Sequence, residues 1–194
     1  MKTAQVHYQE ESKINPKKFV VWLFVVAIIM FFAGLTSAYI VRKGEGNWSD
    51  FNMPVHFLYS TIAIILSSIS LLWAKHNAKN DNTKQTKIGL LFTLILGITF
   101  CVFQFYAWKN LVSQNLYFAD NINGDNISAS FIYALTGLHV LHVLAGIIFL
   151  LIVFYKALLN KISSNRIMAL EQLGIYWHFI GIVWIYLYLF FNLT

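Results

Sequence analysis

Five long apolar blocks constrain the fold of this chain more than any other feature. They cover residues 18–41, 54–74, 87–108, 131–155 and 173–192, and charged residues occur in them only at their margins. A helix needs about 20 mostly apolar residues to cross the roughly 30 Å hydrocarbon layer of a bilayer, and each block meets that length. The pattern predicts an all-α integral membrane bundle of five transmembrane helices, forming a single membrane domain over residues 1–194.

Composition and charge support the same class of protein. The chain is 58% apolar and only 11% charged, whereas about a quarter of the residues of a soluble domain are charged. The net charge of +6 does not indicate a nucleic-acid partner, because the basic residues gather at the ends of the apolar blocks. The polar first eighteen residues lack the features of a cleavable signal peptide, so we expect the first span to be retained.

The distribution of lysine and arginine predicts the orientation in the membrane. Eleven basic residues fall in the N-terminal tail and in the loops after the second and fourth blocks, while three fall on the opposite side. Basic residues near the ends of spans favour the cytoplasmic side. We therefore expect a cytoplasmic N-terminus and a periplasmic C-terminus.

Small residues in the blocks indicate close helix packing. Helices in a bilayer associate through tight packing and interhelical hydrogen bonds, for which small residues make room. The candidates for packing positions are Gly34, Ala38, Gly89, Gly97, Gly137 and Gly146. Most of the tryptophans, Trp177 among them, fall near the ends of the blocks, where aromatic residues anchor a protein at the membrane interface.

Three histidines in the last two blocks are the candidate ligands. His139 and His142 are three residues apart and share one helix face, and His178 lies in the next helix. A neutral imidazole binds iron or copper, but three histidines supply only one complete axial pair, and the blocks contribute no carboxylate. We favour a structural role, in which the histidines bond across helices or to a lipid headgroup. A haem-b anchor with His178 and one of the other two as axial ligands stays open.

Two stretches resemble subunit III of the haem–copper respiratory oxidases. They are TGLHVLHVLAG at 136–146 and YWHFIGIVW at 176–184. The matching residues are Thr136, Gly137, His139, His142, Val143, Gly146, Tyr176, Trp177, His178, Phe179, Val183 and Trp184. Weaker similarity covers residues 30–40 and 96–108. The family occurs with seven helices or, in many bacteria, with five, and the five blocks are similar to the shorter form.

The resemblance implies a function for the chain. It would be a non-catalytic subunit of a complex that reduces dioxygen and pumps protons in the bacterial inner membrane. Haems and copper would be held by subunits I and II, with no cofactor or metal in this chain, which would pack on subunit I and bind phospholipid. The residues expected to be structural or to contact lipid are His139, His142, Tyr176, Trp177, His178 and Trp184. A subunit III-like protein of a quinol oxidase or a nitric oxide reductase is the alternative, and membership of a larger respiratory assembly is left open.

The chain departs from this family at three positions. Many members carry a membrane-buried glutamate where this chain has Ile28, another glutamate where it has Ala107, and an aspartate where it has Gly181. A carboxylate inside the membrane is by default a functional hypothesis. A proton-linked role that rests on these acids cannot be transferred to this chain.

Overall fold

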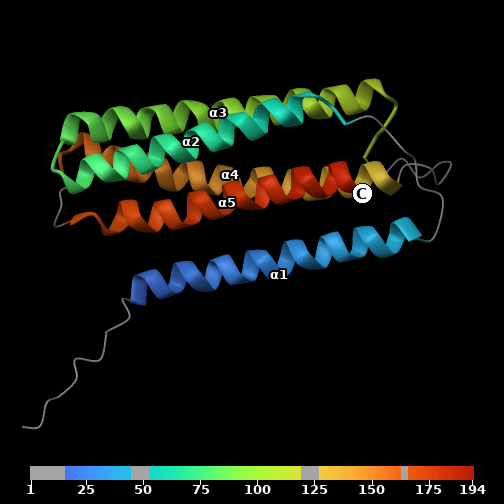
Figure 1. The fold of residues 1–194 in the computed structure, drawn as a ribbon, viewed down its shortest axis with the longest axis horizontal. Coiled ribbons are helices and arrows are strands. Elements are labelled where there is room, and N and C mark those ends of the chain that lie inside the picture. The colour runs from blue at the N-terminus through green and yellow to red at the C-terminus, as the bar shows by residue number, and fades with distance from the viewer. Residues whose placement is uncertain (1–15, 45–52, 119–126, 163–165) are drawn as a thin grey trace, which may run out of the picture.

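The computed structural model describes residues 16–44, 53–118, 127–162 and 166–194. Within these ranges the chain forms helices and no strand (Figure 1). The helices are α1 (Pro16–Gly44), α2 (His56–Lys79), α3 (Thr83–Ser113), α4 (Ile127–Leu158) and α5 (Met168–Leu193). All five are long and apolar enough to cross a membrane, which confirms the predicted fold class. The assignment of the whole chain to one domain and the orientation of its termini stay predictions.

The ends of α2, α3 and α4 are built in the same way. Each helix is followed by a residue with positive φ: Asp81 (54°), Asn115 (61°) and Asn160 (52°). After α2, the backbone N–H of Asn82 donates to the carbonyl of Asn77 at 3.0 Å, which closes the last turn. Asp and Asn tolerate this left-handed conformation better than other residues with a Cβ. Polar residues beyond the apolar blocks therefore decide where these helices stop.

Four of the helices close a bundle, and the fifth lies against its side. α2 packs on α3 and α5, and α4 packs on the same two helices. The connection between α2 and α3 is only three residues long, which places the two helices antiparallel as neighbours. α1 contacts α4 and α5 and stands apart from α2 and α3 in Figure 1.

α1 is attached through a single stripe of side chains. The buried residues of this helix recur every three or four positions: Val25, Ile28, Phe32, Thr36 and Tyr39. That spacing follows one face of a helix. The other faces of α1 are apolar and exposed, as expected for a helix that meets lipid or another subunit.

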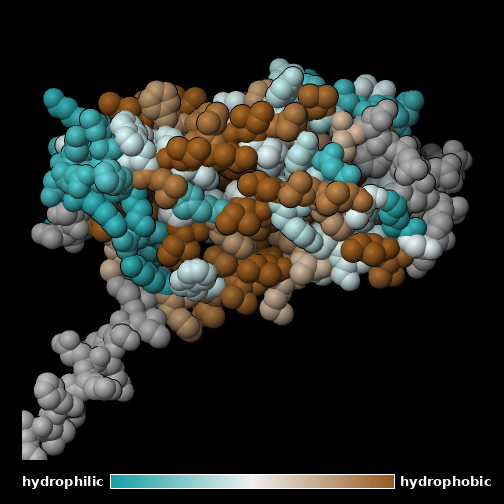
Figure 2. Space-filling model, viewed as in Figure 1, coloured by the Kyte–Doolittle hydropathy of each residue, from teal (hydrophilic) through white to brown (hydrophobic). Residues whose placement is uncertain are grey.

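The surface of the molecule is divided as in a membrane protein. Figure 2 shows apolar side chains over the middle of the helices, with hydrophilic side chains gathered at the end that carries the α2–α3 connection. Lys75, His76 and Lys79 of α2 lie at this end. The exposed apolar band is the part that a bilayer or a partner subunit would cover.

Candidate functional site

His139 is enclosed by aromatic rings in the interior of the bundle. It is 0% exposed, and its ring centroid lies 5.1 Å from that of Trp184, 5.7 Å from that of Phe100 and 6.2 Å from that of Phe32. These three rings come from α5, α3 and α1. Among the described residues, neither ring nitrogen of His139 has a hydrogen-bond partner. The imidazole therefore acts here as a packed ring at the meeting point of four helices.

His142 belongs to the contact between α4 and α5. Its Nδ1 lies 2.7 Å from the carbonyl oxygen of Leu138, one turn earlier in the same helix. The hydroxyl of Tyr176 donates to the backbone carbonyl of His142 at 3.0 Å. The shared face predicted for His139 and His142 is present, because the ring of Phe32 contacts both imidazoles.

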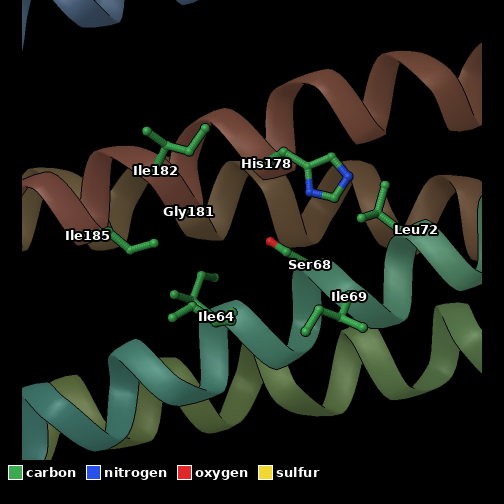
Figure 3. A pocket seen from close by; sticks show the side chains of 9 residues that line it. Ile64, Ser68, Ile69, Leu72, His178, Gly181, Ile182 and Ile185 are labelled. Carbon is green, nitrogen blue, oxygen red and sulfur yellow. The ribbon is translucent and has the colours of Figure 1, made fainter.

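His178 faces a different part of the molecule. It lines a groove of about 260 Å³ between α2 and α5, together with Ser68 and Leu72 (Figure 3). His178 is thus separated from His139 and His142, which share the ring of Phe32, and the three histidines do not converge on one centre. In the described ranges, no group of three or more His, Cys, Asp or Glu side chains is placed to hold a metal ion.

Tryptophans form the polar contacts that join the helices of the bundle. Three indole N–H groups each donate to a hydroxyl on another helix: Trp177 to Ser67 at 2.9 Å, Trp184 to Thr61 at 2.9 Å and Trp108 to Thr136 at 3.0 Å. Each hydroxyl in turn donates to a carbonyl three or four residues earlier in its own helix. The hydroxyl is satisfied as donor and as acceptor, so these polar groups carry little cost inside the membrane.

Two further side-chain bonds join helices. The Gln104 side chain on α3 donates to Ser60 on α2 at 2.9 Å. The Tyr186 hydroxyl on α5 donates to Thr36 on α1 at 3.1 Å. Together with the tryptophan pairs, these bonds tie each helix of the chain to at least one neighbour by a side-chain hydrogen bond.

Trp177 occupies two close helix approaches. A Cβ added at Gly97 of α3 would lie 3.0 Å from this indole, and one added at Gly146 of α4 would lie 3.1 Å from it. At the α2–α3 contact, a Cβ added at Gly89 would lie 2.8 Å from the Cβ of Ala74. These three glycines therefore stand where a larger residue would push helices apart.

The other predicted packing residues do not lie at such contacts within this chain. Gly34 and Ala38 are exposed on α1, and a Cβ added at Gly34 or at Gly137 would meet nothing within 4 Å. Their spacing alone does not show which face of a helix packs. Interfacial anchoring is wrong for Trp177, which is buried in the bundle, whereas Trp22 is exposed on α1 in keeping with that expectation.

The positions at which the resemblance leads one to look for acids are apolar and enclosed. Ile28 is 5% exposed on the buried stripe of α1, and Ala107 is 0% exposed on α3. Gly181 lines the groove between α2 and α5. A carboxylate at Ile28 or Ala107 would be buried away from water, and the apolar blocks around these positions contain no charged residue to pair with it. Burial of such an unpaired charge costs free energy.

The sequence alone does not predict that the hydroxyls of Ser60, Thr61 and Ser67 accept hydrogen bonds from side chains of other helices. Ser60 and Ser67 carry the spacing of small packing residues, and Thr61 carries no signal by itself. The spacing of donors on α5 and acceptors on α2 could have identified them as partners. The seven-residue step from Trp177 to Trp184 on α5 corresponds to the six-residue step from Ser67 back to Thr61 on α2, as antiparallel helices require.

Comparison with known proteins places the chain among respiratory proteins. The family described as cytochrome c oxidase subunit III matches residues 9–193. Proteins named cytochrome c oxidase subunit 3 are similar to this chain. The Spodoptera frugiperda protein is 37% identical over 142 residues, covering 73% of this chain and 89% of that protein. The Drosophila yakuba protein is 34% identical over 143 residues, covering 74% of this chain and 50% of that protein. The Locusta migratoria protein is 30% identical over 179 residues, covering 86% of this chain and 65% of its own length. The chain thus spans about half to two thirds of the latter two relatives.

Proposed function

Because the chain belongs to the cytochrome c oxidase subunit III family, we propose that it is the non-catalytic subunit III of a proton-pumping terminal oxidase. In this proposal it packs directly on subunit I, and the haems and copper are held by subunits I and II. Phospholipid binds to its surface. The chain keeps the neighbouring catalytic subunit in its active arrangement during turnover.

This proposal rests mainly on one observation: the large polar and aromatic side chains inside the bundle are engaged in contacts between or within its helices. Its largest buried side chains, Trp177 and Trp184, fill the space between helices and donate hydrogen bonds across them. His139 lies among aromatic rings, and His142 contacts its own helix. These groups are used to hold helices together, which favours a supporting subunit.

The alternative of a haem-b anchor receives less support from the same geometry. Axial ligation requires two imidazoles that face each other across a space the size of a porphyrin. His139 is surrounded by Phe32, Phe100 and Trp184, whereas His178 lines a groove on the outside of the α2–α5 pair. Either histidine would have to leave its present neighbours to serve as a partner of the other.

Exposed apolar side chains provide a means of acting on a partner. Phe24 and Met30 on α1 are exposed, as are Phe92 and Phe105 on α3. Close packing of such a surface on another membrane subunit excludes lipid and restrains the partner's helices. A catalytic subunit deprived of this contact would lose structure gradually, with its redox centres still in place.

We also propose the location and the orientation of the chain. The bacterial inner membrane is suggested by the five-helix form, and a cytoplasmic N-terminus by the basic residues on that side. Identification of the catalytic subunit that co-purifies with this chain, followed by a test of whether cytochrome c or quinol reduces it, decides between the oxidase and the alternative enzymes.

Progress curves test the proposed role. Oxygen consumption is followed for the intact complex and for the complex depleted of this subunit, at equal haem content. We expect equal initial rates and a faster decline of activity in the depleted complex. An immediate and complete loss of activity with unchanged haem spectra would show that the chain takes part in the reaction itself.

A further inference from the structure

The two ends of α1 are attached to the bundle in different ways. At the C-terminal end, Tyr39 is 3% exposed, and its ring centroid lies 5.0 Å from that of Phe190 on α5 and 5.9 Å from that of Phe131 on α4. About one turn earlier, Thr36 accepts a hydrogen bond from the Tyr186 hydroxyl at 3.1 Å. Aromatic rings from two helices and a hydrogen bond therefore hold this end of α1 in place.

The middle of α1 is separated from α5 by an apolar groove of about 350 Å³. Ile29 and Ala33 line it from α1, and Phe179 and Ile182 line it from α5. Both isoleucines are exposed, so the two helices do not pack closely along this stretch. Nearer the N-terminus, Val25 is the first buried side chain in the described part of α1. Apolar packing on α5 therefore contributes little to the attachment of the N-terminal half.

An ion pair makes the contact with α5 at the N-terminal end of α1. Lys18 Nζ lies 2.6 Å from Oε2 of Glu171, in the first turn of α5. The side chains of Lys18 and Glu171 are 41% and 22% exposed, so salt can screen the attraction between them. Lys75 and Lys79 of α2 also attract this carboxylate. Glu171 is thus a negative charge to which lysines of two other helices are drawn.

The acidic residues of the described ranges are two, Asp81 and Glu171. Asp81 lies in the turn after α2 and has interactions of its own. The charges that act on Glu171 are those of Lys18, Lys75 and Lys79. Loss of the Glu171 charge would therefore remove the electrostatic attraction that α5 exerts on the N-terminal end of α1.

We infer that the Lys18–Glu171 ion pair is a latch that holds the N-terminal half of α1 against α5. When the pair opens, this half moves away from α5, the C-terminal end keeps its aromatic contacts, and the groove between the two helices widens. Ionic strength at the membrane surface sets how often the latch is open, because salt weakens a partly exposed ion pair. The latch works in the same way whichever oxidase the chain belongs to.

Pulsed electron paramagnetic resonance on the full-length chain in lipid nanodiscs tests the latch by measuring distances between spin labels. Labels on Val20→Cys and Ile88→Cys report the N-terminal end of α1 relative to α3, and labels on Ile40→Cys and Val112→Cys report the opposite end. These four side chains are exposed. Cys101→Ser removes the native thiol from the background.

Glu171→Gln and Lys18→Gln each remove one charge of the latch with little change in side-chain size. Asp81→Asn and Lys84→Gln are the matched controls, since both residues are exposed and lie near the α2–α3 connection. Asparagine also tolerates the positive φ of position 81.

We expect Glu171→Gln and Lys18→Gln to raise the population with the longer Val20–Ile88 distance about two- to fivefold, the range that a partly exposed ion pair allows. The Ile40–Val112 distance should stay the same. A salt concentration on the order of 1 M should have the same effect on the chain with an intact latch, and no further effect on Glu171→Gln. Both controls should keep the original distances.

Three results would overturn the inference. Unchanged distances in Glu171→Gln and Lys18→Gln would mean that the buried stripe alone positions α1. A joint shift of both label pairs would mean that α1 leaves the bundle as a whole, and an equal shift in either control would mean that surface charge acts without this pair. If a variant does not insert into nanodiscs, the salt titration of the chain with the intact latch decides alone. The progress curves of the depleted complex test the proposed function separately from all of these results.

Discussion

Removal of the Trp177 indole is the perturbation that the bundle should tolerate least. This side chain of α5 lies against Gly97 of α3 and Gly146 of α4, and it donates to Ser67 of α2. A Trp177→Ala substitution therefore weakens contacts among four helices at once. We expect the subunit to lose a large part of its stability, although no catalytic group is touched.

The loss of stability can be calculated from the cavity that the indole leaves and from the lost hydrogen bond to Ser67. A residual cavity of roughly 100 Å³ costs about 2.4 kcal/mol at ~24 cal/mol per Å³. The interhelical hydrogen bond adds about 0.6 kcal/mol, the average found for such bonds in a membrane. The expected total is about 3 kcal/mol. Trp177→Phe keeps most of the ring and loses the donor, so its cost should be near 1 kcal/mol.

The assay titrates the purified complex with a denaturing detergent and records the concentration at which half of the subunit unfolds and is released. The linear dependence of stability on denaturant converts midpoints into free energies. Trp22→Ala, which truncates an exposed tryptophan of α1, is the control. Equal losses for Trp177→Ala and Trp177→Phe would refute the argument from packing, and a loss of similar size for Trp22→Ala would refute the argument from burial.

Three further outcomes are expected. Replacement of His139 and His142 by alanine should weaken assembly or lipid retention and leave the haem spectra of the assembled oxidase unchanged; loss of a haem band would contradict this. Carbodiimide should modify no carboxylate within the spans except Glu171 at the inner margin of α5, as located by mass spectrometry of peptides. An impermeant maleimide applied from the periplasmic side should label Ser113→Cys and spare Lys79→Cys, and the reverse pattern would invert the proposed orientation.

The helices could be predicted from the sequence because one physical requirement dominates them. A span must be long, apolar and free of interior charge, and all five blocks satisfy this. The ends of the helices are harder to predict from the sequence. α3 runs from Thr83 to Ser113, beyond the predicted block at 87–108. Its ends depend on capping by Asn82 and on the turn at Asn115, which are polar features outside the apolar pattern.

The contacts between helices could be predicted only in part. Spacing identified Gly89 and Gly97 as candidates, and both lie at close approaches, but the same reasoning selected Gly34, which is exposed. Small residues make an approach feasible without fixing which helix approaches. The burial of Trp177 could not be predicted, because a tryptophan near the end of an apolar block is typical of the membrane interface. Only the structure shows that its acceptor, Ser67, lies on another helix of the bundle.

The shallow attachment of α1 has a consequence for how the chain is made. This helix is made before α4 and α5, which it contacts, and the bond between Thr36 and Tyr186 joins residues 150 positions apart. During synthesis α1 must stay in the bilayer without these contacts until α5 is inserted. The Thr36 hydroxyl donates to the Phe32 carbonyl of its own helix at 2.9 Å, so its proton is satisfied in lipid before Tyr186 arrives. α1 thus enters the bilayer ahead of both helices on which it docks, so its place against the bundle is decided only after α4 and α5 have been inserted.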